Sequence, residues 1–179
     1  VNLTAFPFTG GLMPYIAREV FALGPQGLAS LVASYAVGSL VGSLAMGMAG
    51  GRLRPGRTML GAALLWYVCL AGFAASRQPG LAMAMLVGAG IAQSTSMLAL
   101  SMLLLRSSDQ RFRGRIMGVR MLAIYPLPLG LLIAGALIPE LGYHVTATLM
   151  LLSGLAMTAA VALGWRRELM PVGALANGR

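Results

Sequence analysis

The sequence predicts an all-α polytopic membrane protein in which six transmembrane helices form one bundle. Apolar residues make up 58% of the 179 residues and charged residues only 9%, against about 45–50% and about 25% in soluble domains. So few charges cannot cover a soluble fold of this size. A collagen-like or disordered chain is excluded, because the 24 glycines follow no period and the apolar content is high.

The second observation is the length of the apolar runs. A helix that crosses a bilayer needs about 20 mostly apolar residues. Five runs meet this requirement clearly, and a weaker one lies at the N-terminus. The predicted spans are about 1–17, 28–50, 59–76, 81–105, 116–138 and 145–164, which form a transmembrane domain over 1–164 followed by a cytoplasmic tail at 165–179.

The first predicted span carries polar and helix-breaking residues, among them Asn2, Thr4, Pro7 and Pro14. A broken helix of this kind often borders a transport pathway. The alternative is that the span is truncated, so that its polar residues do not mark a transport pathway. Because the chain begins at Val1 rather than at a methionine, we expect it to be a fragment of a longer gene product.

The second and third predicted spans carry small residues that favour close packing of helices. Small residues let transmembrane helices approach closely, and 28–50 carries them in steps of four at Ser34, Gly38 and Gly42, with Met46 continuing the row. A parallel row runs through Ser39, Ser43 and Gly47, and Gly130 and Ala134 repeat the pattern in the fifth span. In the third span Cys69, the single cysteine, is interpreted as a small packing residue.

The fourth span holds the most polar cluster, at Gln93, Ser94, Thr95 and Ser96, close to the expected bilayer midplane. Polar groups at that depth must find partners or face a cavity. One interpretation is a substrate-facing patch formed by Gln93 and Ser96 on one helix face. The other is hydrogen bonding between helices, which we favour for Ser94 and Thr95.

The fifth span has Pro126 and Pro128 at its centre, preceded by Tyr125. Each proline lacks an N–H and clashes with the preceding turn, so we predict a kink there. The freed carbonyls would suit a cavity or a gating bend. A purely structural kink is the alternative.

Arginine placement predicts the orientation. All 13 basic residues are Arg. Nine of them lie in the gaps 51–58 and 106–115 and at Arg166 and Arg167 of the tail, with Arg120 and Arg179 nearby, whereas Arg18 and Arg77 alone occupy the alternate gaps. Because positive charge stays in the cytoplasm, both termini are predicted to be cytoplasmic. The arginines do not line one soluble face, so nucleic acid is not an expected partner.

Enzyme chemistry has little support in the sequence. No acidic residue lies within a predicted span, and His144, the single histidine, lies at an outer membrane edge. Paired carboxylates are therefore missing from the membrane, and His144 and Ser153 would lie about 13 Å apart along one helix. We expect no catalytic residues, no metal site and no cofactor.

Three segments resemble the C-terminal half of a major facilitator superfamily transporter, in the branch of the enterobactin exporters and macrolide efflux proteins. The first is GSLVGSLAMGMAGGRLRPGR, from Gly38 to Arg57; the second is RGRIMG, from Arg113 to Gly118; the third is PLGLLIAGALIPELG, from Pro128 to Gly142. In order and spacing they are similar to the family's glycine-rich helix with its basic hairpin and to its eleventh helix. The chain departs from the hairpin motif at Gly51, where the family usually has an acidic residue.

The resemblance implies a twelve-helix fold in the inner (cytoplasmic) membrane, of which this chain supplies one six-helix bundle and a missing N-terminal half the other. It implies efflux of small organic molecules by alternating access. The site residues implied are the cavity candidates Asn2, Gln93, Ser96 and Tyr125, the gating candidates Pro126 and Pro128, and the cytoplasmic anchors Arg52, Arg57, Arg113 and Arg115. If protons drive export, the titrating carboxylate lies in the missing half.

Two other functions remain open. A non-transporting six-helix scaffold could associate through its glycine rows, and an upstream reading frame with six further spans would argue against it. An intramembrane enzyme is the third and weakest hypothesis.

Overall fold

The computed structural model describes residues 3–49, 53–107, 114–115, 118, 121 and 126–164. In this part of the chain the regular elements are all helices. The all-helical prediction is confirmed for these residues. Asn2, Arg52, Arg113, Tyr125 and the tail at 165–179 lie outside them.

Four helices are long and apolar enough to cross a membrane. They are α3 (Pro25–Ala49), α4 (Pro55–Ala75), α5 (Pro79–Ser107) and α8 (Tyr143–Gly164). Even α4, with 21 residues, is about 31 Å long at 1.5 Å per residue, which matches a hydrocarbon core of about 30 Å. The apolar helix α7 (Pro126–Leu141) has 16 residues and is shorter than that thickness.

The helices begin earlier than hydropathy predicted, because proline starts them. Pro25, Pro55 and Pro79 are the first residues of α3, α4 and α5. Proline suits a first helical turn, since its missing N–H would have no partner there and its φ is already helical. At the other end of α7, Gly142 has φ +79°. This left-handed residue ends α7 and lets α8 begin at once.

The N-terminal segment is broken, where one weak span was predicted over 1–17. It consists of α1 (Phe6–Thr9), α2 (Met13–Tyr15) and η1, a π-helix over Ile16–Val20. Gly10 to Leu12 form turns between the first two pieces. The break follows from the sequence, because Gly10 and Gly11 have low helix propensity and Pro14 cannot donate a backbone hydrogen bond.

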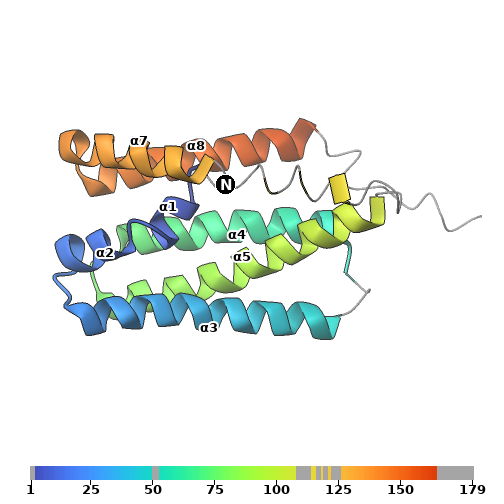
Figure 1. Ribbon diagram of the computed structural model, residues 1–179, viewed down its shortest axis with the longest axis horizontal. Coiled ribbons are helices and arrows are strands. Elements are labelled where there is room, and N and C mark those ends of the chain that lie inside the picture. Colours follow the sequence, from blue (N-terminus) through green and yellow to red (C-terminus); the bar gives the residue numbers. More distant parts are fainter. Residues whose placement is uncertain are drawn as a thin grey trace, which may run out of the picture.

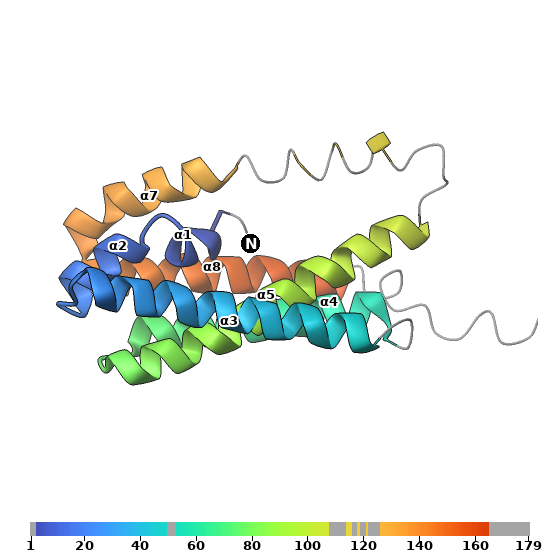
Figure 2. The same ribbon diagram turned by 60° about the horizontal axis from the view of Figure 1, so that its bottom comes forward.

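The helices form a ring of neighbours (Figures 1 and 2). Contacts join α3 to α5, α5 to α4, α4 to α8 and α8 to α7, and the N-terminal segment closes the ring by contacting α7 and α3. The long helices run nearly along the same direction. Their connections therefore gather at the two ends of the bundle, as in a membrane protein whose loops face water on both sides.

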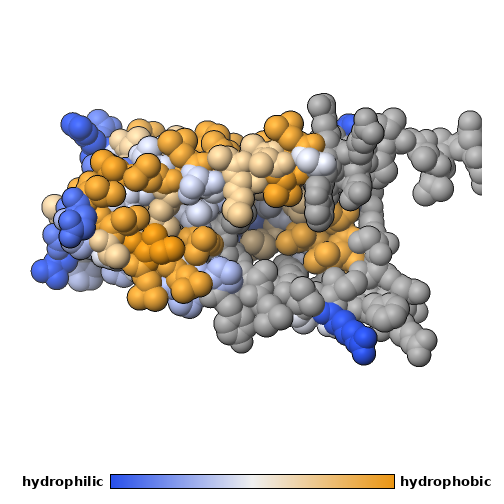
Figure 3. Space-filling view, turned by 90° about the horizontal axis from the view of Figure 1, so that it is seen from above, coloured by the Kyte–Doolittle hydropathy of each residue, from blue (hydrophilic) through white to orange (hydrophobic). Residues whose placement is uncertain are grey.

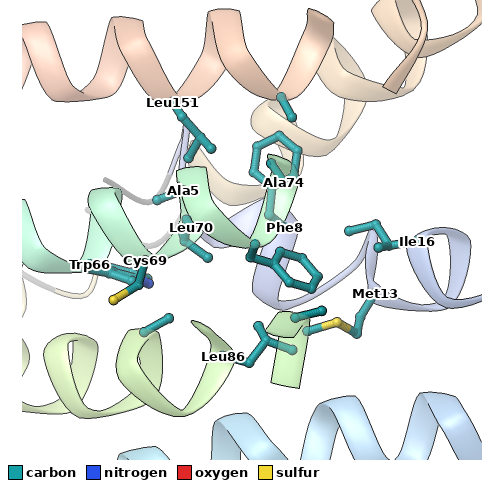
Figure 4. Close-up of a cluster of buried hydrophobic side chains, with 14 of the residues drawn as sticks. Ala5, Phe8, Met13, Ile16, Trp66, Cys69, Leu70, Ala74, Leu86 and Leu151 are labelled. Atoms are coloured by element: carbon teal, nitrogen blue, oxygen red, sulfur yellow. The ribbon is translucent and has the colours of Figure 1, made fainter. Parts of the chain in front are cut away.

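The core fills the centre of this ring (Figure 4). Phe8, Ile16, Trp66 and Leu70 are at most 1% exposed. They come from the N-terminal segment and from α4, and Leu86 of α5 packs with them. The broken N-terminal segment is thus a central part of the packing rather than a peripheral strap.

The outer surface is apolar as well. On α3, Leu40, Leu44 and Met48 are exposed, Met48 by 83%. On the opposite side of the molecule, Figure 3 shows apolar side chains over much of the visible face, with hydrophilic ones toward the two ends. A soluble protein rarely exposes such continuous apolar surface. This distribution is typical of helices that face lipid.

The predicted small-residue row of α3 packs against α5. A Cβ added at Gly38 would lie 2.9 Å from the Cα of Val87, and one added at Gly42 would lie 2.9 Å from the Cα of Ile91. The two backbones are therefore in direct contact at these glycines. Gly38, Gly42 and Met46 are buried, so the prediction of tight packing is confirmed for this row.

Candidate functional site

The polar cluster of α5 lies at the middle of that helix and divides between its neighbours. Ser96 is 8% exposed, and its hydroxyl donates to the backbone carbonyl of Met59 on α4 at 3.2 Å. Ser94 faces α3 beside Gly42 and donates to the carbonyl of Ile91 in its own helix at 3.1 Å. Ser96 therefore makes the hydrogen bond between helices that the sequence left open as an alternative.

Gln93 behaves differently from these serines. It is half-buried, and its amide makes no hydrogen bond to any residue that the structure describes. A primary amide carries two donors and one acceptor. Thr95 also has no side-chain hydrogen bond among the described residues, but the Gln93 amide has the larger hydrogen-bonding capacity left for a ligand, for water or for a second protein segment.

A second polar contact, which the sequence did not predict, holds the N-terminal segment to the bundle. The hydroxyls of Thr4 and Tyr67 lie 2.8 Å apart and share a hydrogen bond. Both pack against Gly154 of α8, where an added Cβ would collide with them. Gly154 is therefore a glycine because three segments meet there.

The start of α8 adds two hydroxyls at the same interface. Tyr143 packs edge-on against Phe8, with ring centroids 6.4 Å apart, and Thr146 is fully buried. Neither hydroxyl has a hydrogen-bond partner in the described part of the chain. Buried unpaired hydroxyls are rare. The interface between the N-terminal segment and α8 thus has two hydroxyls at its outer end that are available for further hydrogen bonds.

His144 joins α8 to α4. Its Nδ1 lies 2.9 Å from the carbonyl oxygen of Ala74, in the last turn of α4. The last carbonyls of a helix have no partner within the helix. Because a carbonyl only accepts, Nδ1 carries the proton and donates it, which leaves Nε2 at the bundle surface.

A cavity of about 300 Å³ lies beside this contact, between α4 and α8. One wall consists of residues of α4, namely Tyr67, Ala71, Ala74 and Ala75. The other wall consists of residues of α8, namely His144, Thr148, Leu151, Leu152 and Leu155. Its lining is mostly apolar, with His144 and Thr148 at one end and Tyr67, whose hydroxyl bonds to Thr4, toward the other. A mostly apolar lining with a few polar groups is usual for a site that binds an amphipathic molecule.

The predicted gating prolines lie where the described part of α7 begins. Pro126 is the first residue of that part, and Pro128 lies in the same turn. Residues 122–125 lie outside the described part, so the predicted kink in the middle of a span stays a prediction.

The predicted cytoplasmic anchors are described in part. Arg57 is exposed in the first turn of α4, and Arg115 is an exposed helical residue. Arg54, just before α4, is exposed too. At the opposite end of the bundle lie Arg18 and Glu19, which form an ion pair at 3.3 Å.

Two further charges occupy that opposite end, Arg77 after α4 and Glu140 near the end of α7. The two acids therefore balance the two arginines there. The described charges at the end that carries Arg54, Arg57 and Arg115 are all positive. The orientation was predicted from the number of arginines alone, which is also larger at the end that carries Arg54, Arg57 and Arg115.

Metal chemistry finds no support in the described residues. No group of three or more His, Cys, Asp or Glu side chains is close enough there to hold an ion. Cys69 is buried and free.

Comparison with known proteins identifies no family for this chain. No family model matches the chain, and no curated protein and no solved structure matches it either. The resemblance to the major facilitator superfamily therefore stays a prediction from the sequence.

Proposed function

We propose that this chain is one six-helix bundle of a secondary active transporter that exports small organic molecules by alternating access. In this proposal it has the fold of a C-terminal half in the major facilitator superfamily. The bundle lies in the inner (cytoplasmic) membrane, and a second six-helix half packs against it. Substrate passes between the two halves near the bilayer midplane.

Gln93 is the observation that carries the proposal. It lies at the middle of a 29-residue apolar helix, and its amide has no partner among the described residues. A polar group at that depth is costly unless it meets another polar group or a water-filled cavity. An alternating-access transporter has such a water-filled cavity, whereas a bundle that does not transport needs none.

The broken elements support the same function. In transporters, binding sites are often built from discontinuous helices, which leave backbone groups free near the substrate. The N-terminal segment is interrupted between Thr9 and Met13, and Pro126 and Pro128 lie where the sequence predicts a bend in the fifth span. We assign the first and fifth spans to these two regions, with Pro126 and Pro128 as the gating position. Asn2 and Tyr125 remain cavity candidates next to them.

The charge difference supports cytoplasmic termini. Arg57 and Arg115 lie at the end of the bundle that we assign to the cytoplasm, where positive residues are enriched. Arg52 and Arg113 belong to the same two hairpins in the sequence. The opposite end, where acids balance arginines, faces outward in this proposal.

The alternative is a non-transporting scaffold that associates through its glycine rows. Fewer of these glycines are free to contact a partner than the sequence suggested. The row of Gly38 and Gly42 is already occupied by α5. Gly47 alone in these two rows has nothing within 4 Å of an added Cβ. One open glycine is a small surface for association.

The test is saturable flux. The complete reading frame is expressed in cells that lack other efflux pumps, and export of a panel of fluorescent amphipathic dyes is measured. Gln93→Ala should lower the saturable rate at unchanged protein level, because it removes the free amide. The matched control is Ser101→Ala, since Ser101 donates to Met97 within its own helix at 2.7 Å.

Two results would overturn the proposal. One is flux that does not saturate for any dye, and the other is flux that Gln93→Ala and Ser101→Ala change equally. Residues 1–179 alone should show no saturable flux in vesicles, because the second half of the pathway is missing.

A further inference from the structure

We propose that the cavity between α4 and α8 binds one acyl chain of an anionic phospholipid, with its phosphate at the Arg77 end. This site is separate from the midplane substrate pathway. It depends only on the bundle lying in a membrane, so it stands or falls independently of transport.

The first argument is the shape of the cavity. Its walls are rows of residues on two neighbouring helices, and the row on α8 runs from His144 to Leu155. Eleven residues at 1.5 Å per residue make a groove about 16 Å long. A narrow groove of this length suits an extended chain better than a compact solute.

The second argument is the direction in which the groove opens. Its floor is formed by Tyr67, Ala74 and Leu151, which are buried. Its rim includes Ala71 and Leu152, which are exposed. The opening therefore lies along the outside of the bundle, between two helices that are long enough to span, where hydrocarbon chains are the surrounding solvent.

The third argument is the polarity along the groove. Polar rim groups occur only at one end, at His144 and Thr148 in the first turns of α8. The Thr148 hydroxyl donates to the carbonyl of His144 at 2.8 Å, and Nδ1 of His144 is held by Ala74. The leucines and alanines beyond them are apolar. A lipid has the same division between head and tail.

Charge complementarity indicates which lipid head group fits at this end of the groove. Arg77 is exposed two residues after Ala75, the last groove residue of α4. The one ion pair in the described part of the chain joins Arg18 to Glu19, so Arg77 is not neutralised there by an acid. No acidic side chain lines the groove. A phosphate at this end would meet the Arg77 guanidinium.

The experiment uses the purified chain in nanodiscs of phosphatidylcholine with a trace of phosphatidylglycerol that carries a diazirine on one acyl chain. After irradiation, labelled peptides are mapped by mass spectrometry. Label should concentrate on 67–75 and 144–155 rather than on the exposed face of α3. Ala71→Phe, which fills the groove from its rim, should reduce this label to the level on α3.

The matched control is Ala36→Phe, at an exposed alanine of α3, which should leave the groove label unchanged. Ala75→Leu is a second filling variant in case one of them lowers folded yield, and thermal unfolding is recorded for each. Equal label on α3 and on the groove, with no effect of either filling variant, would overturn the proposal.

The head-group part is tested with Arg77→Gln and with Arg57→Gln, an exposed arginine at the other end of α4. An arginine near the membrane surface contributes about a fivefold preference for an anionic lipid. Arg77→Gln should therefore lower the preference for the phosphatidylglycerol probe over a phosphatidylcholine probe about fivefold. Arg57→Gln should not. Equal labelling by both probes in the unsubstituted protein, or stronger labelling by a free fatty-acid probe, would contradict a phospholipid with an anionic head.

Discussion

The α3–α5 and α4–α8 interfaces join neighbouring helices of one bundle in opposite ways. Between α3 and α5, glycines let the backbones touch, and Gly38 and Gly42 lie against Val87 and Ile91. Between α4 and α8, a cavity of about 300 Å³ separates the walls, and the helices are tied at its two ends.

The two ties of the α4–α8 interface differ. One is the hydrogen bond between His144 and the Ala74 carbonyl at 2.9 Å. The other is the packing of Tyr67 against Gly154, where the Tyr67 hydroxyl also bonds to Thr4 of the N-terminal segment. The comparison teaches that glycines bring two helix backbones into contact even where Val87 and Ile91 lie opposite them, whereas alanines that face leucines do not. The alanines of α4 face leucines of α8, and the mismatch in size leaves a groove.

The largest expected effect is at the close interface. Gly38→Ala should destabilise the bundle by about 1–3 kcal/mol, because its Cβ would overlap the backbone of Val87 and push the helices apart. Gly47→Ala is the control, since nothing lies within 4 Å of its added Cβ, and it should stabilise α3 by up to about 1 kcal/mol. Thermal unfolding in one detergent measures both. Equal shifts for the two variants would show that α3 does not touch α5 through Gly38.

A smaller effect is expected at the outer tie of the open interface. His144→Ala leaves the Ala74 carbonyl without its donor and should cost about 0.5–1.5 kcal/mol. Thr148→Ala removes a hydroxyl that bonds within its own helix and should cost less. Unfolding midpoints in denaturant distinguish the two. If Thr148→Ala were the more damaging variant, the tie between α8 and α4 would lie elsewhere.

The smallest effect is expected at the inner tie. Tyr67→Phe removes the hydrogen bond to Thr4, and hydrogen bonds between transmembrane helices contribute about 0.6 kcal/mol on average. A double-mutant cycle with Thr4→Val isolates the coupling from changes in packing. Zero coupling would mean that the two hydroxyls do not share a bond in the membrane.

The sequence predicted the long helices well, because each is a local apolar run. The predicted spans 28–50, 59–76, 81–105 and 145–164 correspond to α3, α4, α5 and α8. Their starts were placed two to four residues too late, in three of the four because hydropathy ignores that Pro25, Pro55 and Pro79 are good first residues. The packing row at Gly38 and Gly42 was also predictable, because the period of four lies within one segment.

The contacts between distant segments could not be predicted in this way. The pairs Ser96 with Met59, His144 with Ala74, and Thr4 with Tyr67 join residues 37 to 70 positions apart. They depend on which helices become neighbours, and apolar periodicity carries no such information. For the same reason the cavity between α4 and α8 had no signal in the sequence.

The most direct test is whether α4 crosses the membrane with its Arg57 end in the cytoplasm. In a Cys69→Ala background, Arg57→Cys and Arg77→Cys are expressed separately in intact cells and exposed to a membrane-impermeant thiol reagent. Both positions are exposed and lie at opposite ends of one 21-residue helix. We expect Arg77→Cys to react from outside and Arg57→Cys to react only after the cells are permeabilised. Reaction of both from the same side would contradict a spanning helix, and the reverse pattern would contradict the orientation.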